Sequence, residues 1–425
     1  MKNLSLCVFF LFIGIISFSC ASAPVNVAPN GRYIPADFTG VVHAGMSANP
    51  EEYELINYMG ISWILQTFYW DRIEPEQGQW NFQGYDTFVD NAAANNVKVF
   101  GVLAYDVYWI HEDQSRHNAV SADQIHYYLD FVRETAEHFK GRVGAWCIWN
   151  EPNFHFWNGT DKEFVELSRQ AADAIREVDS DVILLAGAFN RNVFGLPVSF
   201  IRRMFESGAM DKVDGIAFHP YELNASRAIR LYEQFRKIVD KYGFGDKIWI
   251  TEMGYPTGGL YPTKVPENRF PEMIVKTYAY LAAAGARHVL WYQMFDPEQR
   301  SNNNSEHYFG LTRSLQDHTS KGAEAFRLCS LYMSDTTCYV LTKQDGLPGS
   351  MRAFWFKGSQ RSALVIWNEG GTRNTNIALP GTNHLIHDIY TGSSAPILID
   401  NAVRIGRDPV VITYNHSGEG RPVIR

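Results

Sequence analysis

Residues 143–153 read VGAWCIWNEPN, an apolar run that ends abruptly at an amide, a carboxylate and a proline. The run through Ile148 has the length and composition of a strand that is buried on both faces. Pro152 cannot continue such a strand, so Asn150 and Glu151 stand at its carboxyl end. A buried strand that stops at a charged group indicates that this end opens into a polar site.

Seven further apolar runs lie along the chain, separated by longer amphipathic stretches. They read FTGVVHAG (38–45), ISWILQTFYW (61–70), VKVFGVLAY (97–105), VILLAGAF (182–189), VDGIAFHPY (213–221), KIWITEMGY (247–255) and HVLWYQMFD (288–296). Apolar residues recur every three or four positions in 121–139 and 161–178, which predicts helices there, the first of them starting at Ser121. Eight strands alternating with helices predict an α/β fold, a (β/α)8 TIM barrel over residues 24–334. An open doubly wound sheet is the alternative, but no glycine-rich phosphate loop follows any run.

The pattern of apolar and polar residues changes after residue 334. Short alternating segments such as SMRAFWFKG, RSALVIWNEG and DPVVITYN are separated by glycine, asparagine and proline, without a helical pattern between them. This arrangement is typical of antiparallel strands, so residues 335–425 are predicted to form a small β-sandwich domain. We expect this domain to pack on the barrel and to take no part in catalysis.

The first 23 residues, MKNLSLCVFFLFIGIISFSCASA, combine a basic start, a short apolar stretch and small residues. This pattern predicts an export signal rather than a membrane span. Cleavage before Cys20 would leave a cysteine that can carry a lipid, so the protein is expected outside the cell, in a periplasm, or attached to a membrane surface through Cys20. Of the later cysteines, Cys147 is expected to be a buried apolar residue, and Cys329 and Cys338 are left as either paired or free.

The charge balance of 38 − 46 = −8, without a basic cluster, argues against nucleic acid as a partner. Aromatic residues make up 14% of the chain, which suits a large core and also a cleft that stacks flat ligands or sugar faces. No cofactor motif is present, so no cofactor is expected. The oligomeric state is not indicated.

Two carboxylates occupy predicted strand ends, Glu151 after WCIWN and Glu252 after KIWIT. They are 101 residues apart (252 − 151), close to three βα units, so both are expected to face the barrel mouth. Paired carboxylates across a cleft suit glycosidic bond cleavage, in which one protonates the leaving oxygen and the other attacks or activates water. Trp149 and Pro152 flank Glu151, which favours the proton-holding role for it. The alternative is two strand-end glutamates in unrelated ion pairs.

Four motifs together resemble clan A of the glycoside hydrolases, most closely family 39 and related retaining glycosidases. These are WNEPN (149–153), WITEMGYP (249–256), RIEPEQGQWNFQGYD (72–86) and FHPY (218–221), in order and at barrel spacing. The resemblance implies a retaining double displacement on a poly- or oligosaccharide. It further implies that Glu151 is the acid/base and Glu252 the nucleophile, that Asn150 contacts the 2-hydroxyl of the sugar, and that His219 and Tyr221 orient the nucleophile or the sugar.

Other residues are weaker candidates for substrate contact. Trp291 offers a sugar platform, Trp70 and Trp109 lie in loops that shape the cleft, and His43 ends the first strand. The stretch HEDQSRH (111–117) clusters metal-capable groups but lacks the HExxH spacing, so a rim loop is favoured and no metal is expected. A non-catalytic carbohydrate-binding protein and a transglycosidase remain as alternative functions. The sequence does not indicate the sugar, the linkage, or whether cleavage is internal or terminal.

Overall fold

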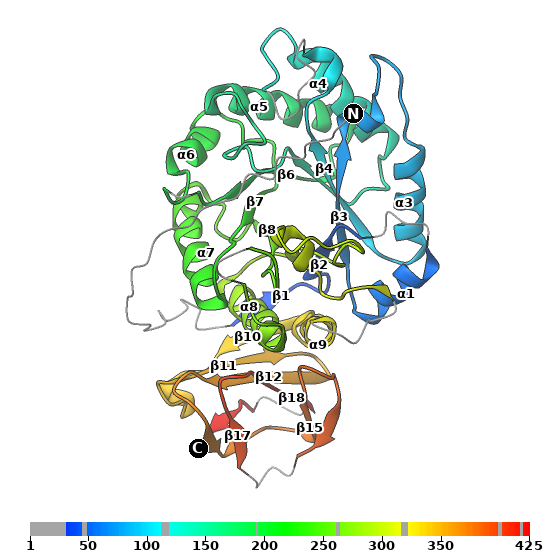
Figure 1. The fold of residues 1–425 in the computed structure, drawn as a ribbon. Coiled ribbons are helices and arrows are strands. Elements are labelled where there is room, and N and C mark those ends of the chain that lie inside the picture. The colour runs from blue at the N-terminus through cyan, green and yellow to red at the C-terminus, as the bar shows by residue number, and fades with distance from the viewer. Residues whose placement is uncertain are drawn as a thin grey trace.

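The computed structural model describes residues 31–44, 49–111, 119–192, 194–260, 264–315, 322–397, 402–416 and 420–425 (Figure 1). Within them, eight parallel strands close into a barrel in chain order, β2 to β9, with helices around it. The strands are β2 (Thr39–Val42), β3 (Trp63–Tyr69), β4 (Lys98–Ala104), β5 (Ala145–Ile148), β6 (Ile183–Asn190), β7 (Gly215–His219), β8 (Ile248–Met253) and β9 (Val289–Trp291). Each coincides with one of the eight predicted runs, and β6 extends one residue past its run, to Asn190. The predicted fold class, a TIM barrel followed by antiparallel β-structure, is confirmed.

Helices follow the strands and cover the outside of the barrel. They are α1 (Pro50–Tyr58), α2 (Trp70–Ile73), α3 (Gln83–Ala94), α4 (Ile125–His138), α5 (Asp161–Val178), α6 (Val198–Glu206), α7 (Ala225–Val239), α8 (Phe270–Ala284) and α9 (Ala323–Met333). A capping box between Thr160 and Glu163 starts α5 at the predicted residue. The predicted start of α4 is wrong, because the Ser121 hydroxyl bonds the side chains of Asp123 and Gln124 in a turn that precedes the helix.

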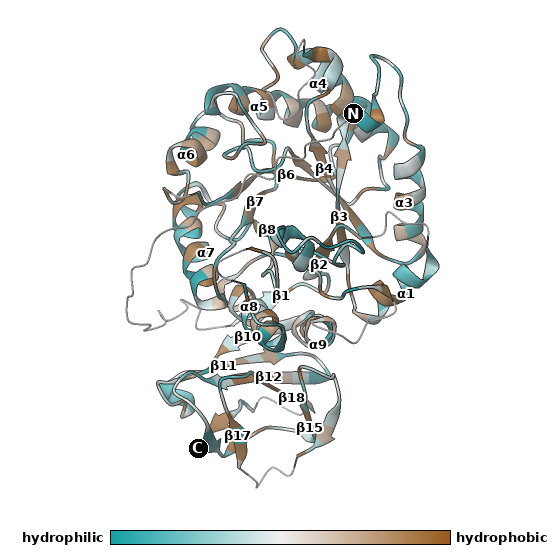
Figure 2. Cartoon of the chain, viewed as in Figure 1, coloured by the Kyte–Doolittle hydropathy of each residue, from teal (hydrophilic) through white to brown (hydrophobic). Residues whose placement is uncertain are grey.

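Aromatic rings fill the barrel at the amino ends of its strands. The ring centroids of Trp63 and Trp249 are 5.3 Å apart, and those of Trp249 and His288 are 3.8 Å apart. All three side chains are buried. This packing closes the lower end of the barrel, so polar side chains can meet solvent only at the carboxyl ends of the strands. Figure 2 shows the corresponding division between largely hydrophobic barrel strands and mixed or hydrophilic outer helices.

The C-terminal domain is built on a seven-stranded sheet in the order β1-β10-β11-β12-β18-β15-β16, beside the pairs β13-β17 and β14-β19. Its strands are β10 (Thr336–Val340), β11 (Met351–Lys357), β12 (Arg361–Asn368), β13 (Arg373–Thr375), β14 (Ile377–Ala378), β15 (Thr382–His387), β16 (Ser394–Pro396), β17 (Val403–Ile405), β18 (Val410–Asn415) and β19 (Val423–Ile424). Its edge strand β1 (Arg32–Ile34) comes from the start of the described chain and pairs with β10. The sequence-based boundary is therefore corrected here, because residues 32–34 belong to the β-domain sheet and not to the barrel.

Each face of the seven-stranded sheet packs against an apolar core. On one face Trp367 and Phe354 pack against Tyr280 of α8, with ring centroids 5.3 and 5.5 Å from it. On the other face Trp355 and Leu364 belong to a second apolar core inside the β-domain. The sheet is thus packed against the barrel helices over a continuous apolar contact (Figure 1).

The three cysteines of the described chain, Cys147, Cys329 and Cys338, are buried and free. Cys329 and Cys338 are therefore not paired. The predicted export signal and Cys20 lie outside the described residues. In the part of the chain that the structure describes, no helix combines the length and apolar character needed to cross a bilayer.

The contact between the two domains predicts the effect of removing its central ring. Trp367 is fully buried, so Trp367→Ala should lower the free energy of unfolding by about 3–5 kcal/mol. Urea unfolding followed by fluorescence and circular dichroism measures the change. Leu331→Ala on α9, where the side chain is 49% exposed, is the matched control and should change stability by less than about 0.5 kcal/mol. A loss below about 1 kcal/mol for Trp367→Ala would contradict this packing.

Candidate active site

Glu151 and Glu252 meet at the barrel mouth, as the strand-end positions predicted. Glu151 follows β5 and Glu252 lies near the end of β8. One carboxylate oxygen of each and a ring nitrogen of His219 all lie within 4.8 Å of one another. Side-chain exposure is 11% for Glu151 and 15% for Glu252, so the two charges are largely removed from water. The alternative of two glutamates in unrelated ion pairs is wrong.

His219, at the end of β7, is the cationic partner of the two carboxylates. Its Nδ1 donates to Oε1 of Glu151 at 2.8 Å and lies 3.7 Å from Oε2 of Glu252. Its Nε2 bonds the Thr251 hydroxyl at 2.9 Å. Burial alone would lower the pKa of His219, but the charges of Glu252 and Glu151 and the hydrogen bond to Glu151 outweigh it and raise that pKa. The raised pKa favours the protonated imidazole, which offsets part of the negative charge of the pair.

Glu252 holds a proton more tightly than an ordinary glutamate. Burial raises its pKa to about 7, and the charge of Glu151 adds to the rise, while His219 and the Tyr221 hydroxyl oppose it. Tyr221 donates this hydrogen bond to Oε2 of Glu252 at 2.9 Å, so it does orient that carboxylate. The expectation of apolar neighbours around the Glu151 carboxyl is not met, because the buried Trp149 ring is directed to the core and donates to the Phe156 carbonyl.

Asn190, at the end of β6, holds Glu151 in place and was missed in the sequence. Its Nδ2 donates to Oε1 of Glu151 at 2.8 Å. Its own backbone is fixed by Asn153, which donates to the Asn190 carbonyl at 2.8 Å and accepts from the Asn190 N–H at 3.2 Å. Its sequence position could have indicated this role, because Asn190 directly follows an apolar run, as Asn150 and Glu151 follow theirs.

The backbone around the carboxylate of β5 adopts an unusual conformation. Trp149 and Glu151 have φ values of 65° and 44°, in the left-handed region that side chains with a Cβ rarely enter. Such strain collects at functional sites, where the surrounding structure imposes it. Between them, Asn150 donates from Nδ2 to the Tyr105 hydroxyl at 3.1 Å, which fixes the amide at the mouth.

A third carboxylate and a tyrosine lie on the β9 side of the mouth and were also missed. The Tyr292 hydroxyl is hydrogen-bonded to Glu306, and the charge of Glu306 acts on Glu252. Tyr292 also packs edge-on against Phe309 and His43, with centroids 5.5 Å apart in each case. His43 is exposed beside Tyr292, and its contact with a ligand stays a prediction.

Two of the predicted aromatic contacts are corrected. Trp70 and Trp291 are fully buried. Trp70 donates to Glu74 and stacks on Phe131 of α4, and Trp291 packs against Tyr278 of α8, so neither ring is available to a ligand. Trp109 is half-buried and its indole N–H donates to the Glu74 carbonyl at 3.1 Å, which leaves part of its ring at the rim.

Metal-capable groups meet at the same place. Among the described residues, Glu151, His219 and Glu252 form a set whose ligand atoms could approach one ion. In this structure the same side chains are joined by hydrogen bonds, from His219 to Glu151 and from Tyr221 to Glu252. Of the HEDQSRH stretch only His111 is described, and it pairs with the buried Asp106 at 2.9 Å.

Comparison with proteins of known sequence gives partial matches. A family profile described as beta-galactosidase matches residues 43–105. Endo-1,4-beta-xylanase B of Thermotoga neapolitana is 28% identical over 214 residues, covering 45% of this chain and 57% of that protein. Endo-1,4-beta-xylanase A of Phanerodontia chrysosporium is 26% identical over 198 residues, covering 43% and 46%. The chain spans about half the length of these curated relatives.

Solved structures match over nearly the whole chain. A family 39 glycoside hydrolase from Bacteroides cellulosilyticus gives a TM-score of 0.74 at 19% identity, covering 90% of this chain and 81% of that one. A family 39 beta-xylosidase from Caulobacter crescentus gives 0.65 at 14% identity, covering 92% and 98%. At these identities the likeness shows a shared fold. Together with the sequence matches, it confirms the predicted resemblance to clan A glycoside hydrolases, most like family 39.

The raised pKa of Glu252 predicts how stability depends on pH. The folded carboxyl keeps its proton to about pH 7, whereas an unfolded one loses it near the ordinary value of 4.5. Folded protein therefore binds more protons in this interval, and stability falls as the pH rises through it. Glu252→Gln removes the titration, so the variant should gain up to about 3 kcal/mol relative to wild type between pH 4.5 and pH 8.

Urea unfolding at pH 4.5, 6 and 8 measures this difference. The control is Glu137→Gln on the exposed face of α4, which should follow the wild-type pH dependence. If the free energy of unfolding depended on pH in the same way for wild type and Glu252→Gln, the raised pKa of the buried carboxyl would be contradicted.

Proposed function

Because the chain resembles clan A glycoside hydrolases, most closely family 39, we propose that it is a retaining glycosidase that acts by double displacement with Glu151 and Glu252. The single observation that supports this best is the spacing of the two carboxylates. Their oxygens approach within 4.8 Å. Retaining enzymes hold their carboxyl groups about 5–5.5 Å apart, whereas inverting enzymes need about 6.5–9.5 Å to admit a water molecule.

In the first step Oε of Glu252 attacks the anomeric carbon and forms a glycosyl ester, while Glu151 donates its proton to the leaving oxygen. In the second step Glu151 removes a proton from water, and the water oxygen displaces Glu252 from the anomeric carbon. The roles follow the family pattern, and the Tyr221 hydrogen bond to Glu252 supports them because it fixes the nucleophile for attack. We propose that Asn150, whose amide is anchored on Tyr105, binds the 2-hydroxyl of the sugar.

The reaction needs one proton on the pair at its start. The carboxylates are close and buried, so together they retain a proton to near neutral pH. The same two carboxylates raise the pKa of His219, so its imidazole is more easily protonated and can offset part of their charge. In the free site this favours a state with one carboxylic acid and one carboxylate, which is the state that the first step uses.

The proposed substrate is a β-linked xylan or xylo-oligosaccharide. The relatives named above include endo-1,4-beta-xylanases and a beta-xylosidase. Among the described residues, His219 is the one cationic group within ion-pair distance of the two carboxylates, which suits a neutral sugar. A β-galactoside or β-glucoside is the comparison substrate, since the matching family profile is described as beta-galactosidase. We further propose that residues 1–23 direct export, with Cys20 as a site of lipid attachment.

Substitution of each glutamate tests the proposed roles. Glu151→Gln and Glu252→Gln should each lower kcat/KM on xylo-oligosaccharides by about 10³-fold or more, since each group acts in the transition state. Glu137→Gln should retain wild-type rates. Azide rescue separates the roles: azide with Glu151→Ala should give the glycosyl azide of retained configuration, and with Glu252→Ala that of inverted configuration.

Full activity of Glu252→Gln on every glycoside that the wild type cleaves would overturn the mechanism. If Glu151→Ala gave the inverted glycosyl azide and Glu252→Ala the retained one, the roles of Glu151 and Glu252 would be reversed. Product analysis with an added sugar acceptor identifies transglycosylation, and binding of xylan without turnover by the wild type would favour a non-catalytic protein.

The pH profile provides a second test. We expect kcat/KM to fall on the alkaline side with an apparent pKa near 7, where the free pair loses its shared proton. Tyr221→Phe removes a donor that stabilises ionised Glu252, so the alkaline limb should shift upward by about one unit. A downward shift, or no shift with kcat/KM merely reduced, would show that the hydroxyl does not act on this titration.

A further inference from the structure

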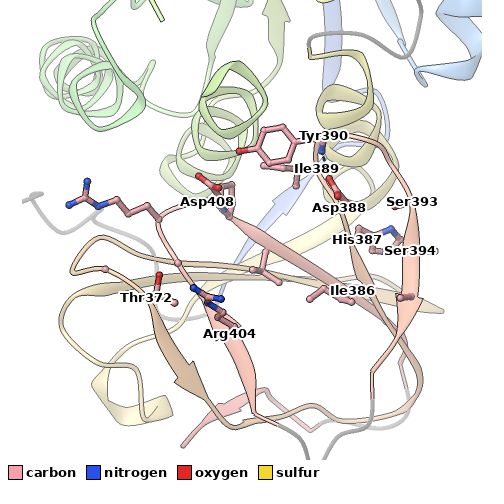
Figure 3. Close-up of a pocket in the computed structure, with 16 residues that line it drawn as sticks. Thr372, Ile386, His387, Asp388, Ile389, Tyr390, Ser393, Ser394, Arg404 and Asp408 are labelled. Carbon is pink, nitrogen blue, oxygen red and sulfur yellow. Dashed lines mark hydrogen bonds between the residues drawn. The ribbon is translucent and has the colours of Figure 1, made fainter. Parts of the chain in front are cut away.

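The β-domain contains a groove of about 800 Å³ in a different part of the molecule from the paired glutamates (Figure 3). It lies between the β15-β16 edge of the large sheet and the separate β13-β17 pair. Residues from four segments line it: Gly371, Thr372, Ile386–Tyr390, Ser393–Ala395, Arg404 and Gly406–Val410.

The groove exists because two layers of strands separate. Stacked sheets usually lie about 10 Å apart with interdigitating side chains, which leaves little space between them. Here the layers diverge, and Ile386 and Val410 on the floor remain partly exposed. Aliphatic surface that stays in contact with water does not contribute the stabilisation that burial gives. A ligand that covers this surface would therefore gain binding free energy from the apolar area that it buries. An apolar floor of this kind fits the flat face of a sugar ring.

The acidic side chains of the groove are already hydrogen-bonded within the domain. Oδ1 of Asp388 accepts the N–H groups of Tyr390 at 2.7 Å and Thr391 at 3.2 Å. Asp408 is hydrogen-bonded to the Tyr390 hydroxyl and lies close enough to Arg269 to act on its pKa. These two carboxylates therefore shape the rim and have donors before any ligand arrives.

The basic side chains differ from the acidic ones. Across the described ranges, no carboxylate lies within ion-pair distance of Arg404 or Arg407, and neither guanidinium has a hydrogen bond. Figure 3 shows the Arg404 side chain between the two walls of the groove, with Thr372 beside it. A guanidinium presents paired N–H donors that match a carboxylate. In a chain with a net charge of −8, two such cations at one groove favour an anionic ligand.

We propose that this groove is a non-catalytic binding site for a polysaccharide that carries carboxylate groups, such as a xylan with uronic acid branches. The sugar rings lie on the floor of Ile386 and Val410, Thr372 and Ser394 meet hydroxyl groups, and Arg404 and Arg407 pair with the carboxylates. The site goes beyond the proposed hydrolysis, because it holds the polymer on the β-domain while the barrel mouth acts on it.

Affinity electrophoresis in gels with glucuronoxylan, and in parallel with neutral arabinoxylan, tests the site. Binding is measured in full-length protein carrying Glu252→Gln, with and without the pair Arg404→Ala and Arg407→Ala. We expect the pair to weaken binding to glucuronoxylan about tenfold or more and to leave arabinoxylan unchanged. Retention on glucuronoxylan should also fall with added salt. Arg373→Ala on β13, an exposed arginine outside the groove, is the matched control and should bind as before.

Hydrolysis of an aryl xyloside by the arginine variants in the native background should equal that of the wild type, which separates the groove from the barrel site. Equal, salt-insensitive binding of both xylans, or equal loss with Arg373→Ala, would overturn the proposal. So would a lack of glucuronoxylan binding by the parent protein. Failure of the wild type to hydrolyse any xyloside would instead contradict the proposed function. The binding measurements would still test the groove, because they do not depend on hydrolysis.

Discussion

Two carboxylates that approach within 4.8 Å inside a protein cannot both remain charged without a partner, and the active site is arranged around this constraint. His219 supplies one positive charge and bonds Glu151, while Glu252 is left with a raised pKa. The consequence is a group of two carboxyls and one imidazole in which Glu252 takes up a proton near neutral pH. Each nearby donor, from Asn190 to Tyr221, sets the position of one oxygen in this group.

The barrel makes this arrangement possible because it fixes the strand ends from which the side chains project. Aromatic packing closes the opposite end of the barrel, so the polar groups share one mouth. The left-handed backbone at Trp149 and Glu151 has a cost of order 1–3 kcal/mol for each residue, and the packed strand and its neighbours must supply it. Precise placement of a buried charge thus depends on a large rigid core, which the high aromatic content provides.

The strands and the paired glutamates could be predicted from the sequence because both depend on local pattern. Apolar runs marked all eight strands, and a charged group directly after such a run marked Glu151 and Glu252. The failures have a common cause. Trp70, Trp291 and Trp149 lie near strand ends, and this position alone suggested that their rings face the cleft or Glu151. The direction of each ring depends instead on which side of the strand packs on a helix, which the apolar pattern does not determine. Asn190 and Tyr292 were missed because single polar residues are informative only when their partners are known.

The large β-domain sheet limits where a ligand can bind to that domain. One face is covered by the barrel through Trp367 and Tyr280, and the other by the second core around Trp355. Adding β1 to the edge at β10 covers that edge as well and ties the beginning of the described chain to its end. An open surface with apolar floor can then arise only where strand pairs separate, as between β17 and β15. The same packing that joins the domain to the barrel therefore leaves the gap between these strand pairs as the place for the proposed second site, where Arg404 and Arg407 have no carboxylate partner among the described residues.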